Sequence, residues 1–426
     1  MEKCVLDELT IDELNKKFND VKEYLEKNPI TFYKGSKSKN PLSININKHT
    51  RFIKFRLQAK TVFHLDTIVI KDREGNQIGI DAQTTISSYY QDNDNHNGSA
   101  FMKRKSNGGC GFHTKNEDNP WFIIDLNKST DVGTIIVNNR DDNFYARALS
   151  LQVKTSRDLS DWTLEYDNYS VLKEYKNGNV DLIEGAFLYA AALDSVKINK
   201  IIKKLKELSR HDIALRCFEL TNILIEDKGL ALGPHGGFTE TFALSSFSEK
   251  KKVYSELSTL LTWLNEELHI AAFISSGTLL GIVRDGDFIG HDDDVDICYI
   301  SNETSESEIL LERKKITAIL EQKGCKVRNS DVAHLWCTTP KGVHIDIFTG
   351  FQESGYCSMN PISRNEINTN SVLPIQKKVV NDYVLYLPFE PNVLLSKNYG
   401  ESWMKPDPIW TFNWGKARKD FSFLYF

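Results

Sequence analysis

The sequence predicts a multidomain α+β protein with an N-terminal antiparallel β-sandwich, a helical linker and a C-terminal α/β domain. Three observations predict this architecture. Short runs of alternating apolar and polar residues, separated by turn residues, recur through residues 51–167. Apolar residues at helical spacing then fill residues 170–232. A strand-length apolar run, a glycine-containing turn and an apolar helical turn follow one another within 271–282.

The composition is that of a globular chain. Its 426 residues suffice for about three domains. Hydrophobic residues make up 40% and charged residues 26%, which is the balance of a folded protein. The net charge of −5 and the isoelectric point near 6.1 argue against general nucleic-acid binding, because that function needs a basic surface.

Cysteine usage and hydropathy predict a cytoplasmic protein. Seven cysteines without Cys-x-x-Cys spacing indicate a reducing compartment rather than a disulfide framework. No apolar run approaches ~20 residues, and the first four residues, Met-Glu-Lys-Cys, begin no signal peptide. We therefore expect no integral membrane segment, and any contact with the inner membrane face to be peripheral and made through a partner.

Residues 1–30 are predicted to be a helical segment. Asn28 and Pro29 end its apolar pattern. We expect one or two amphipathic helices that pack on the next domain, with partner binding as the alternative. The apolar residues at near-helical spacing are Val5, Leu6, Leu9, Leu14, Phe18, Val21 and Leu25.

Residues 31–170 are predicted to form the sandwich. Turn residues at 72–76 separate the early strands from the later ones. Several short strands at this spacing favour two packed antiparallel sheets. The strand-like runs occupy 52–57, 65–70, 121–126, 132–137 and 149–153.

Local motifs in this segment resemble the discoidin family (factor 5/8 C-type). They are GFHT at 111–114, NPWFIIDL at 119–126, NNRD at 138–141, Arg147 and SRDLSDW at 156–162. The resemblance implies an eight-stranded jelly-roll-like sandwich of a kind that often binds carbohydrate or other surface ligands. The chain lacks an obvious pair of terminal cysteines for the disulfide of many extracellular members, which agrees with a cytoplasmic location.

Glycan binding by this domain depends on residues that have two interpretations each. The polar loop from Asp92 to Asn97 could hold an ion or a glycan, or be a solvated loop. Arg140 and Arg147 could contact a ligand or form internal salt bridges. Trp121 and Trp162 are more often core residues than sugar-stacking platforms. The expected glycan binding therefore rests mainly on the resemblance.

Residues 171–232 are predicted to be a helical linker between the sandwich and the final domain, residues 233–426. Apolar faces lie at 183–193 and 198–208, and a third helix is expected at 212–225. Asp227-Lys228-Gly229 then supplies a helix stop.

The final domain is organised around residues 271–297. In a strand, alternate side chains share a face, so Asp292, Asp294 and Asp296 line one side while Val295 and Ile297 point to the other. Two carboxylates ~4 Å apart repel by roughly 4 kcal/mol at an effective dielectric of ~20. A divalent cation removes that cost, and oxygen ligands select Mg2+, Mn2+ or Ca2+.

An isolated Asp-x-Asp more often marks a solvated turn or a surface Ca2+ loop, but three further features favour an active site. Gly277 and Thr278 lie in a strand-to-helix turn that is suited to hold phosphate on helix N-terminal amides. Arg284 lies between this turn and the aspartates. Asp346 lies on an otherwise apolar strand at 343–348. The pattern is typical of a nucleotidyltransferase-type active site.

These blocks resemble the LicD/fukutin family. The matching residues are GTLLG at 277–281, Arg284, HDDDVD at 291–296, IDIF at 345–348 and a tail, NYGESWMKP, at 398–406. The resemblance implies a nucleotidyltransferase-like fold. It also implies transfer of a phosphorylated alcohol, of the phosphocholine, ribitol phosphate or glycerol phosphate type, from a CDP-linked donor to a hydroxyl of a cell-surface or capsular glycan, with release of CMP.

The resemblance implies metal-assisted phosphoryl transfer. We expect Asp294, Asp296 and Asp346 to hold one or two Mg2+ (or Mn2+) ions against the donor pyrophosphate. Asp346, or alternatively Asp292, could assist deprotonation of the acceptor hydroxyl. Asp292 and Asp293 could instead support the metal ligands or cap a helix.

The remaining predicted contacts involve the donor phosphates. Gly277 and Thr278 would offer backbone amides to phosphate oxygens, and Arg284 would add a positive charge. Two other functions stay open. One is a nucleotidyltransferase that attaches NMP to a small molecule or protein and releases pyrophosphate. The other is a non-catalytic glycan-binding scaffold, against which the intact set of aspartates argues.

Overall fold

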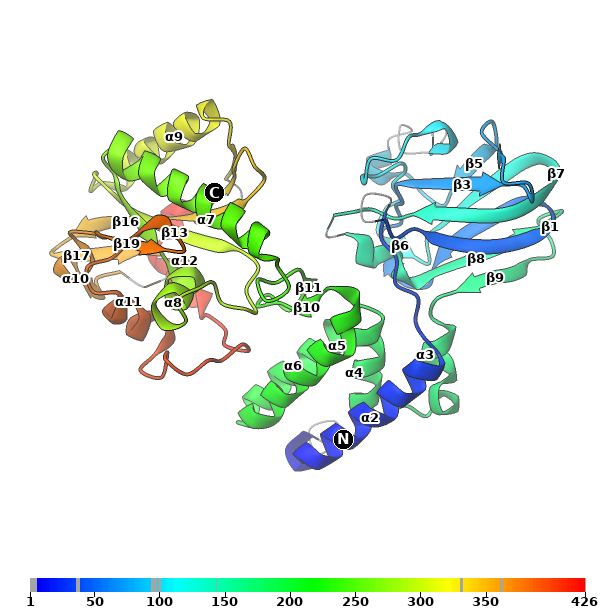
Figure 1. The fold of residues 1–426 in the computed structure, drawn as a ribbon, viewed down its shortest axis with the longest axis horizontal. Coiled ribbons are helices and arrows are strands. Elements are labelled where there is room, and N and C mark those ends of the chain that lie inside the picture. Colours follow the sequence, from blue (N-terminus) through cyan, green and yellow to red (C-terminus); the bar gives the residue numbers. More distant parts are fainter. Residues whose placement is uncertain are drawn as a thin grey trace. The chain divides into compact units, whose positions relative to one another are not determined.

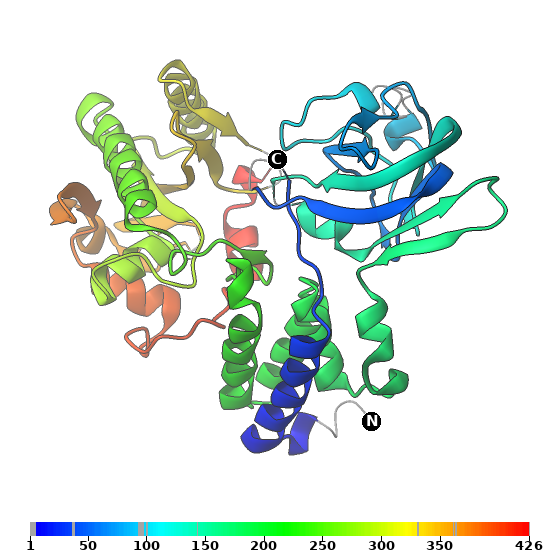
Figure 2. The same cartoon turned by 45° about the vertical axis from the view of Figure 1, so that its right-hand side comes forward.

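The computed structural model describes residues 6–35, 39–92, 98, 101–142, 144–329, 332–360, 362 and 364–425. Figures 1 and 2 show the chain from two directions. It divides into two compact units, Met1–Lys228 and Gly229–Phe426. The first unit contains an antiparallel sheet and a group of helices, and the second is a mixed α/β domain. The predicted α+β class is therefore confirmed.

The sheet of the first unit is built around two long antiparallel neighbours, β1 (Leu42–Leu57) and β7 (Trp121–Asn138). Its strand order is β4-β3-β7-β1-β8-β9, and β5 also pairs with β7. The other strands are β3 (Thr67–Lys71), β4 (Gln77–Ile78), β5 (Gln83–Ile86), β8 (Leu151–Ser156) and β9 (Thr163–Asp167), with a separate short pair of β2 (Lys60–Thr61) and β6 (Glu117–Asp118).

One strand, β7, covers two apolar runs that the sequence separates, at 121–126 and 132–137. The interruption begins at Asn127, whose φ of +66° bends the chain, a conformation that asparagine adopts more readily than most residues. The pairing with β1 shifts register between Thr50 and Phe52. The first half of β7 consequently pairs with β5 and the second half with β3. A polar bend inside a continuous strand has the same sequence pattern as a turn between two strands.

Aromatic rings fill the core beside this sheet. The rings of Phe112 and Phe122 stack with centroids 4.5 Å apart, and the ring of Phe101 meets both edge-on at 5.1 Å. All three side chains are buried. Such ring pairs stabilise a fold by about 0.5–1.5 kcal/mol beyond their burial. The phenylalanines of the GFHT and NPWFIIDL motifs are therefore core residues.

The N-terminal helix α2 (Ile11–Lys27) packs with helices that follow the sheet, as both views show. The ring of Phe18 meets that of Phe187 at 5.4 Å. The hydroxyl of Tyr24 donates to the carbonyl of Val171 at 3.0 Å. The partner helices are α3 (Ser170–Glu174), α4 (Leu182–Ala191), α5 (Val196–Glu207) and α6 (His211–Ile225).

The second unit is organised on a mixed sheet of strand order β12-β13-β16-β15-β14. β13 and β16 run parallel, and the other neighbours on this path are antiparallel. The strands are β12 (Ala271–Ile274), β13 (Val295–Ser301), β14 (Lys326–Arg328), β15 (Leu335–Thr338) and β16 (His344–Glu353), extended beyond β16 by β17 (Tyr356–Met359) and β18 (Ile367–Asn368). Two hairpins are not hydrogen-bonded into this sheet, β10 (Ala231–Leu232) with β11 (Phe238–Thr239), and β19 (Gln376–Val380) with β20 (Tyr383–Leu387).

Helices lie on both sides of these strands in Figure 1. The apolar face of α7, with Leu257, Leu260 and Leu261 fully buried, packs into the same core as β12 and β13. This core fixes the strands that carry the aspartates. Among the helices described, none combines the length and the hydropathy that a membrane crossing requires. The helices are α7 (Phe247–Thr262), α8 (Ser276–Arg284), α9 (Glu306–Gln322), α10 (Thr369–Val372), α11 (Pro391–Tyr399) and α12 (Trp414–Asp420).

Candidate active site

The two strands that carry the predicted aspartates are neighbours in the sheet. β13 and β16 are parallel, and Asp296 lies directly opposite Asp346. Val295, Ile297 and Ile345 are buried in the core. Because side chains alternate along a strand, the carboxylates of Asp296 and Asp346 project to the opposite face. The fold thus brings together two motifs that are far apart in the sequence.

Asp294, directly before β13, completes a group of three carboxylates. One oxygen atom from each of Asp294, Asp296 and Asp346 lies within 4.8 Å of the others. The side chains of Asp294 and Asp346 are 30% and 18% exposed, so solvent and small ligands can reach the group. The three predicted metal ligands therefore meet at one place.

Burial and mutual repulsion favour the protonated form of three carboxyl groups of the HDDDVD motif, those of Asp292, Asp294 and Asp296. Burial, followed by the charges of Asp346 and Asp293, raises the pKa of Asp294 to about 6. Burial, followed by the charges of Asp294 and Asp292, raises the pKa of Asp296 well above its ordinary range. Burial and the charge of Asp294 do the same to the pKa of Asp292. A nearby cation has the opposite effect, because it favours the ionised carboxylates.

The donor set fits Mg2+ or Mn2+. Hard divalent cations prefer oxygen ligands, and three converging carboxylate oxygens supply both the ligands and the negative charge. Asp294, Asp296 and Asp346 are the residues that would hold the ion. A second group, His235, Asp293 and Asp294, also offers ligand atoms within 4.8 Å of one another. His235 belongs to the loop between β10 and β11, and sequence analysis did not single it out.

Gly277 lies where α8 approaches the aspartates most closely. A Cβ atom at this position would be 2.4 Å from Oδ2 of Asp292, a separation that real side chains do not show. The backbone N–H of Gly277 also hydrogen-bonds the carboxylate of Asp296 and lowers its pKa, against the larger effect of burial. Gly277 therefore positions two carboxylates, and its contact with phosphate stays a prediction.

Hydrogen bonds hold the strand-to-helix turn against β13. The backbone N–H of Asp296 donates to Oγ1 of Thr278 at 2.7 Å, and the N–H of Ser275 donates to the carbonyl of Asp296 at 2.9 Å. Ser276 between them has a φ of +45°, and its buried Oγ has no hydrogen-bond partner among the residues described. Strained backbone of this kind clusters at functional turns. Ser276 is thus a candidate ligand contact that sequence analysis missed.

Arg284, at the end of α8, is paired with its neighbour. Its Nε and one terminal nitrogen donate to the two carboxylate oxygens of Asp285 at 2.9 and 2.7 Å. The side chain is only 7% exposed. Burial, then the charge of Arg284, lowers the pKa of His291 to about 4. The positive charge lies near the HDDDVD motif, and its contact with phosphate stays a prediction.

His334 is a neighbour of the acidic group that the sequence did not indicate. Its Nε2 lies 3.0 Å from Oδ2 of Asp346, without forming a well-aligned hydrogen bond. Its ring contacts Phe348 at 5.0 Å between centroids. The antiparallel pairing of β15 with β16 places His334 beside Asp346, and no local sequence motif predicts this contact. His344, by contrast, is exposed and contacts Oγ1 of Thr338 at 3.0 Å.

Tyr399, at the end of α11, is another neighbour to which the sequence attached no role. Burial first, and then the charges of Asp296, Asp292 and Asp294, raises its pKa well above the ordinary range. Its ring also contacts that of Trp410 at 4.6 Å. The tail motif NYGESWMKP contains Tyr399, so a sequence signal existed without a role attached to it.

The sandwich carries a separate cluster around two predicted arginines. The guanidinium of Arg147 lies 4.3 Å from the ring centroid of Phe144, and that of Arg140 lies 5.2 Å from it. A terminal nitrogen of Arg147 is 3.3 Å from Nε2 of His64. Burial and the charges of both arginines lower the pKa of His64 to about 3. Arg140 also pairs with Asp142 at 2.9 Å.

The other predicted sugar contacts on the sandwich have different outcomes. In the loop from Asp92 to Asn97, residues 93–97 and the side chain of Asp92 lie outside the described residues. Trp121 and Trp162 are both partly exposed, and the ammonium of Lys54 lies 5.4 and 5.6 Å from their ring centroids. Neither tryptophan is fully in the core.

Two carboxylates on adjacent strands and a third directly before one of them, beside a glycine-containing turn into a helix, are the features of a nucleotidyltransferase-type domain. Residues 269–389 match the family model described as LicD/FKTN/FKRP, nucleotidyltransferase domain. Residues 106–185 match the model described as NedA-like, galactose-binding domain, of the F5/F8 type C class. The chain therefore combines a LicD-type transferase domain with a discoidin-like domain, and this prediction from its motifs is confirmed.

Similarity to individual proteins is low. Among solved structures, the crystal structure of ANT(2")-Ia in complex with adenylyl-2"-tobramycin shares 13% sequence identity with the chain. The match covers 41% of this chain and 87% of that one, with a TM-score of 0.27. No curated protein matches the sequence significantly.

Proposed function

We propose that the protein transfers a phosphorylated alcohol from a CDP-linked donor to a hydroxyl group of a cell-surface or capsular glycan and releases CMP. The alcohol phosphate is of the phosphocholine, ribitol phosphate or glycerol phosphate type. The observation that carries the proposal is the meeting of Asp294, Asp296 and Asp346 in a domain that matches the LicD/FKTN/FKRP model. A bound Mg2+ or Mn2+ would neutralise charge on the donor pyrophosphate and polarise it.

The bond changes balance without an oxidant or reductant. The acceptor oxygen forms a bond to the phosphorus that carries the alcohol. The bond between that phosphorus and the bridging oxygen breaks, and CMP leaves with the bridging oxygen and its electron pair. The acceptor hydroxyl loses one proton, which a carboxylate near the reacting atoms accepts.

Asp292 and Asp346 are the two candidates for that proton. Asp292 lies against Gly277, where the close approach of the backbone fixes its carboxylate. Burial and the charge of Asp294 raise its pKa, so it would accept the proton only in the ionised form that a bound cation favours. Asp346 has Nε2 of His334 at 3.0 Å from its carboxylate.

The start of α8 is suited to hold the donor phosphates. The partial positive charge of a helix N-terminus favours phosphate, and its first backbone amides are available as donors. Thr278 contributes such an amide while its hydroxyl is occupied by Asp296. Ser276 adds a buried hydroxyl with no partner among the described residues. Arg284 reaches a phosphate only after it releases Asp285.

The cluster on the sandwich supports a glycan-binding role for the discoidin-like domain. The side chain of Phe144 is 45% exposed, so it offers an apolar surface to a sugar ring. Arg147 beside it supplies donors for sugar hydroxyls. His64, 3.3 Å from Arg147, is itself buried and does not offer its ring to a ligand. Its strongly lowered pKa keeps it neutral near pH 7.

Product analysis tests the proposed reaction. The purified protein with Mg2+ is incubated with CDP-choline, CDP-glycerol or CDP-ribitol and with candidate glycans. We expect release of CMP from one donor, dependent on an acceptor. Release of pyrophosphate from a nucleoside triphosphate would instead identify a nucleotidyltransferase. Absence of nucleotide binding in calorimetry, with glycan binding retained, would identify a scaffold.

A further inference from the structure

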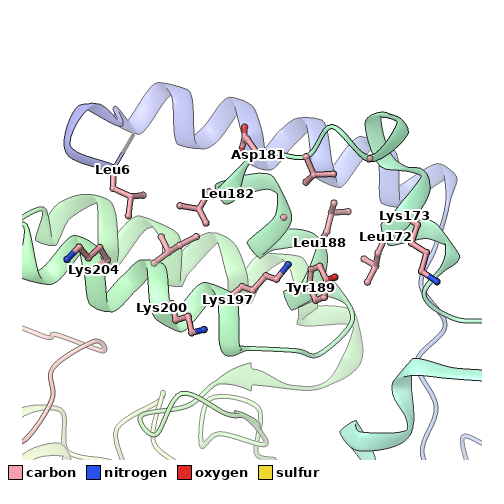
Figure 3. Close-up of a pocket in the computed structure, with 14 residues that line it drawn as sticks. Leu6, Leu172, Lys173, Asp181, Leu182, Leu188, Tyr189, Lys197, Lys200 and Lys204 are labelled. Atoms are coloured by element: carbon pink, nitrogen blue, oxygen red, sulfur yellow. The ribbon is translucent and has the colours of Figure 1, made fainter. Parts of the chain in front are cut away.

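The helical part of the first unit contains a groove of about 980 Å3. It lies among α3, α4 and α5, and Leu6 borders it at one end (Figure 3). This volume is within the ~300–1,000 Å3 range of small-molecule sites. The aspartates of the LicD-type domain do not line it, so a separate function must be considered.

The floor of the groove is apolar. Leu172, Leu182, Leu188 and Ile201 line it, and Figure 3 shows labelled leucines between the helices. Gly185 on α4 also lines the groove and leaves it open, because a Cβ atom there would meet only Val180, at 3.5 Å. An apolar surface of this kind gains free energy when a hydrocarbon chain covers it.

One rim of the groove is strongly basic. Lys197, Lys200 and Lys204 occur on α5 at spacings of three and four residues, which places them on one side of the helix. Figure 3 shows the three side chains along the same edge. Lys173 of α3 adds a fourth ammonium group. This concentration of positive charge stands out in a chain whose net charge is −5.

The lysine charges are mostly not neutralised within the part of the chain that the structure describes. Lys197 lies 3.5 Å from the ring centroid of Tyr189, and Lys173 donates to the neutral side chain of Gln58. Lys204 pairs with exposed Glu207, a weak interaction in water. Among the described residues that line the groove, Asp181 is the acidic one, and it already pairs with Lys17.

We propose that this groove binds an anionic amphiphile with a phosphate head group, which is a function beyond the proposed transferase reaction. The hydrocarbon part covers the leucines, and the phosphate meets Lys197, Lys200 and Lys204. A nucleic-acid backbone would leave the apolar floor unused. A free phosphate ion would do the same. The amphiphile can come from a membrane leaflet or be a soluble lipid phosphate, since both present the same chemistry.

The test measures binding of monomeric dihexanoyl phosphatidic acid to the full-length protein by calorimetry. Inorganic phosphate serves as the probe without a hydrocarbon chain. We expect the lipid to bind measurably and phosphate alone to bind far more weakly. Equal affinity for both probes, or no binding of the lipid, would overturn the proposal.

Charge variants test the basic rim. Lys200→Glu should weaken lipid binding at least about fivefold, because one lysine near an anionic surface contributes about that factor. Lys203→Glu makes the same change on the same helix at an exposed position that does not line the groove. Equal weakening by the two substitutions would assign binding to general surface charge and contradict the proposal.

Volume variants test the apolar floor while every lysine is retained. Gly185→Leu should fill the groove and abolish lipid binding, whereas Gly185→Ala should leave most of it. Circular dichroism and thermal melting check that both variants are folded. Unchanged binding by Gly185→Leu would show that the lipid lies elsewhere.

Vesicles separate the two sources. Cosedimentation compares phosphatidylcholine vesicles with and without phosphatidic acid. Binding that needs phosphatidic acid and is lost in Gly185→Leu would identify a membrane lipid as the ligand. Binding of the monomeric lipid without vesicle binding would identify a soluble lipid phosphate. Vesicle binding that survives Gly185→Leu, without binding of the monomer, would overturn the groove assignment.

Discussion

The backbone positions of Asp294, Asp296 and Asp346 are fixed by the fold, whereas the acidic residues of a surface cluster can move apart. Asp296 and Asp346 are register partners on adjacent parallel strands, and Asp294 directly precedes one of those strands. The chain cannot relieve the repulsion by moving the side chains far apart. Repulsion between the three carboxylates therefore lowers the stability of the metal-free protein. Such a loss of stability is common at functional sites.

The first prediction at this scale concerns the metal ligands. Asp294→Asn or Asp296→Asn should reduce transfer roughly a thousandfold, since loss of one charged ligand removes several kcal/mol of transition-state stabilisation. The fold should remain intact, which circular dichroism would show. Asp346→Asn should behave in the same way. Near-normal turnover of any of the three variants at saturating Mg2+ would contradict the assignment.

The second prediction concerns pH and metal together. The pKa of Asp294 is about 6 in the folded protein against an ordinary value of 3.8. Between these values the folded state binds more protons than the unfolded state, so metal-free stability falls as pH rises from about 4 to 6. Mg2+ should then raise the melting temperature more at pH 8 than at pH 5.

Asp294→Asn provides the matched comparison. Without metal at pH 8 this variant should melt at a higher temperature than the unmodified protein, because one repelling charge is gone. Its gain from Mg2+ should be smaller, since one ligand is lost. A lower melting temperature of the metal-free variant at pH 8 would show that repulsion is not the dominant effect.

The third prediction concerns Gly277. Gly277→Ala places a Cβ atom where Oδ2 of Asp292 lies, 2.4 Å away, and should displace that carboxylate. We expect turnover to fall on the order of a hundredfold, the scale of loss that a misplaced reacting group causes. Gly237→Ala is the control, because nothing lies within 4 Å of its added carbon. Equal activity of the two variants would show that the contact is unimportant.

At the scale of elements, the acidic site follows from strand alternation and the pairing of β13 with β16. In the structure β13 begins at Val295, so Asp292 and Asp294 precede the strand in which alternation predicts them. Alternation predicts that the carboxylates of HDDDVD share a face, and the short apolar runs predict two strands. The sequence thereby indicates Asp294, Asp296 and Asp346 as partners. That β13 and β16 are neighbours depends on the tertiary fold, and it agrees with the prediction that Asp346 lies beside the aspartates of HDDDVD.

The same reasoning cannot find His334 or Tyr399. His334 reaches Asp346 only through the β15–β16 pairing, and no periodicity of its own segment encodes that register. Tyr399 lies close enough to the aspartates for their charges to raise its pKa. The packing of α11 that places it there cannot be predicted from the spacing of residues along the helix. β7 shows the opposite failure. Asn127 interrupts its alternating pattern, so the sequence predicts two strands where the structure has one.

At the scale of the whole molecule, the two domains suggest a division of labour between chemistry and acceptor capture. A second binding site on the same chain raises the local concentration of a long acceptor to the millimolar range when the tether is short. The benefit disappears when the acceptor cannot span both sites. The sandwich cluster around Phe144 is the candidate for the second site.

The fourth prediction follows from this division. Phe144→Ala combined with Arg147→Ala should raise the apparent KM for a long glycan about tenfold or more, within the range of avidity effects. The KM for a short fragment of the same glycan should change little. Arg157→Ala, which removes an exposed arginine elsewhere on the sandwich, serves as the control. If long and short acceptors suffer equally, the sandwich has a structural role and the capture hypothesis is wrong.

The packing of α2 with the helices after the sheet has one more consequence. The chain leaves the helical bundle after Lys27 and returns to it at Ser170, and Tyr24 contacts Val171 across that gap. The sandwich is therefore an insertion, attached to its host by two adjacent connections. Another domain could replace the sandwich if its two ends lie equally close together, because this is the geometric condition that the two connections impose. A variant in which a short loop replaces residues 31–168 would keep the order of the helices in the sequence. It would be a shorter protein with the same helical bundle.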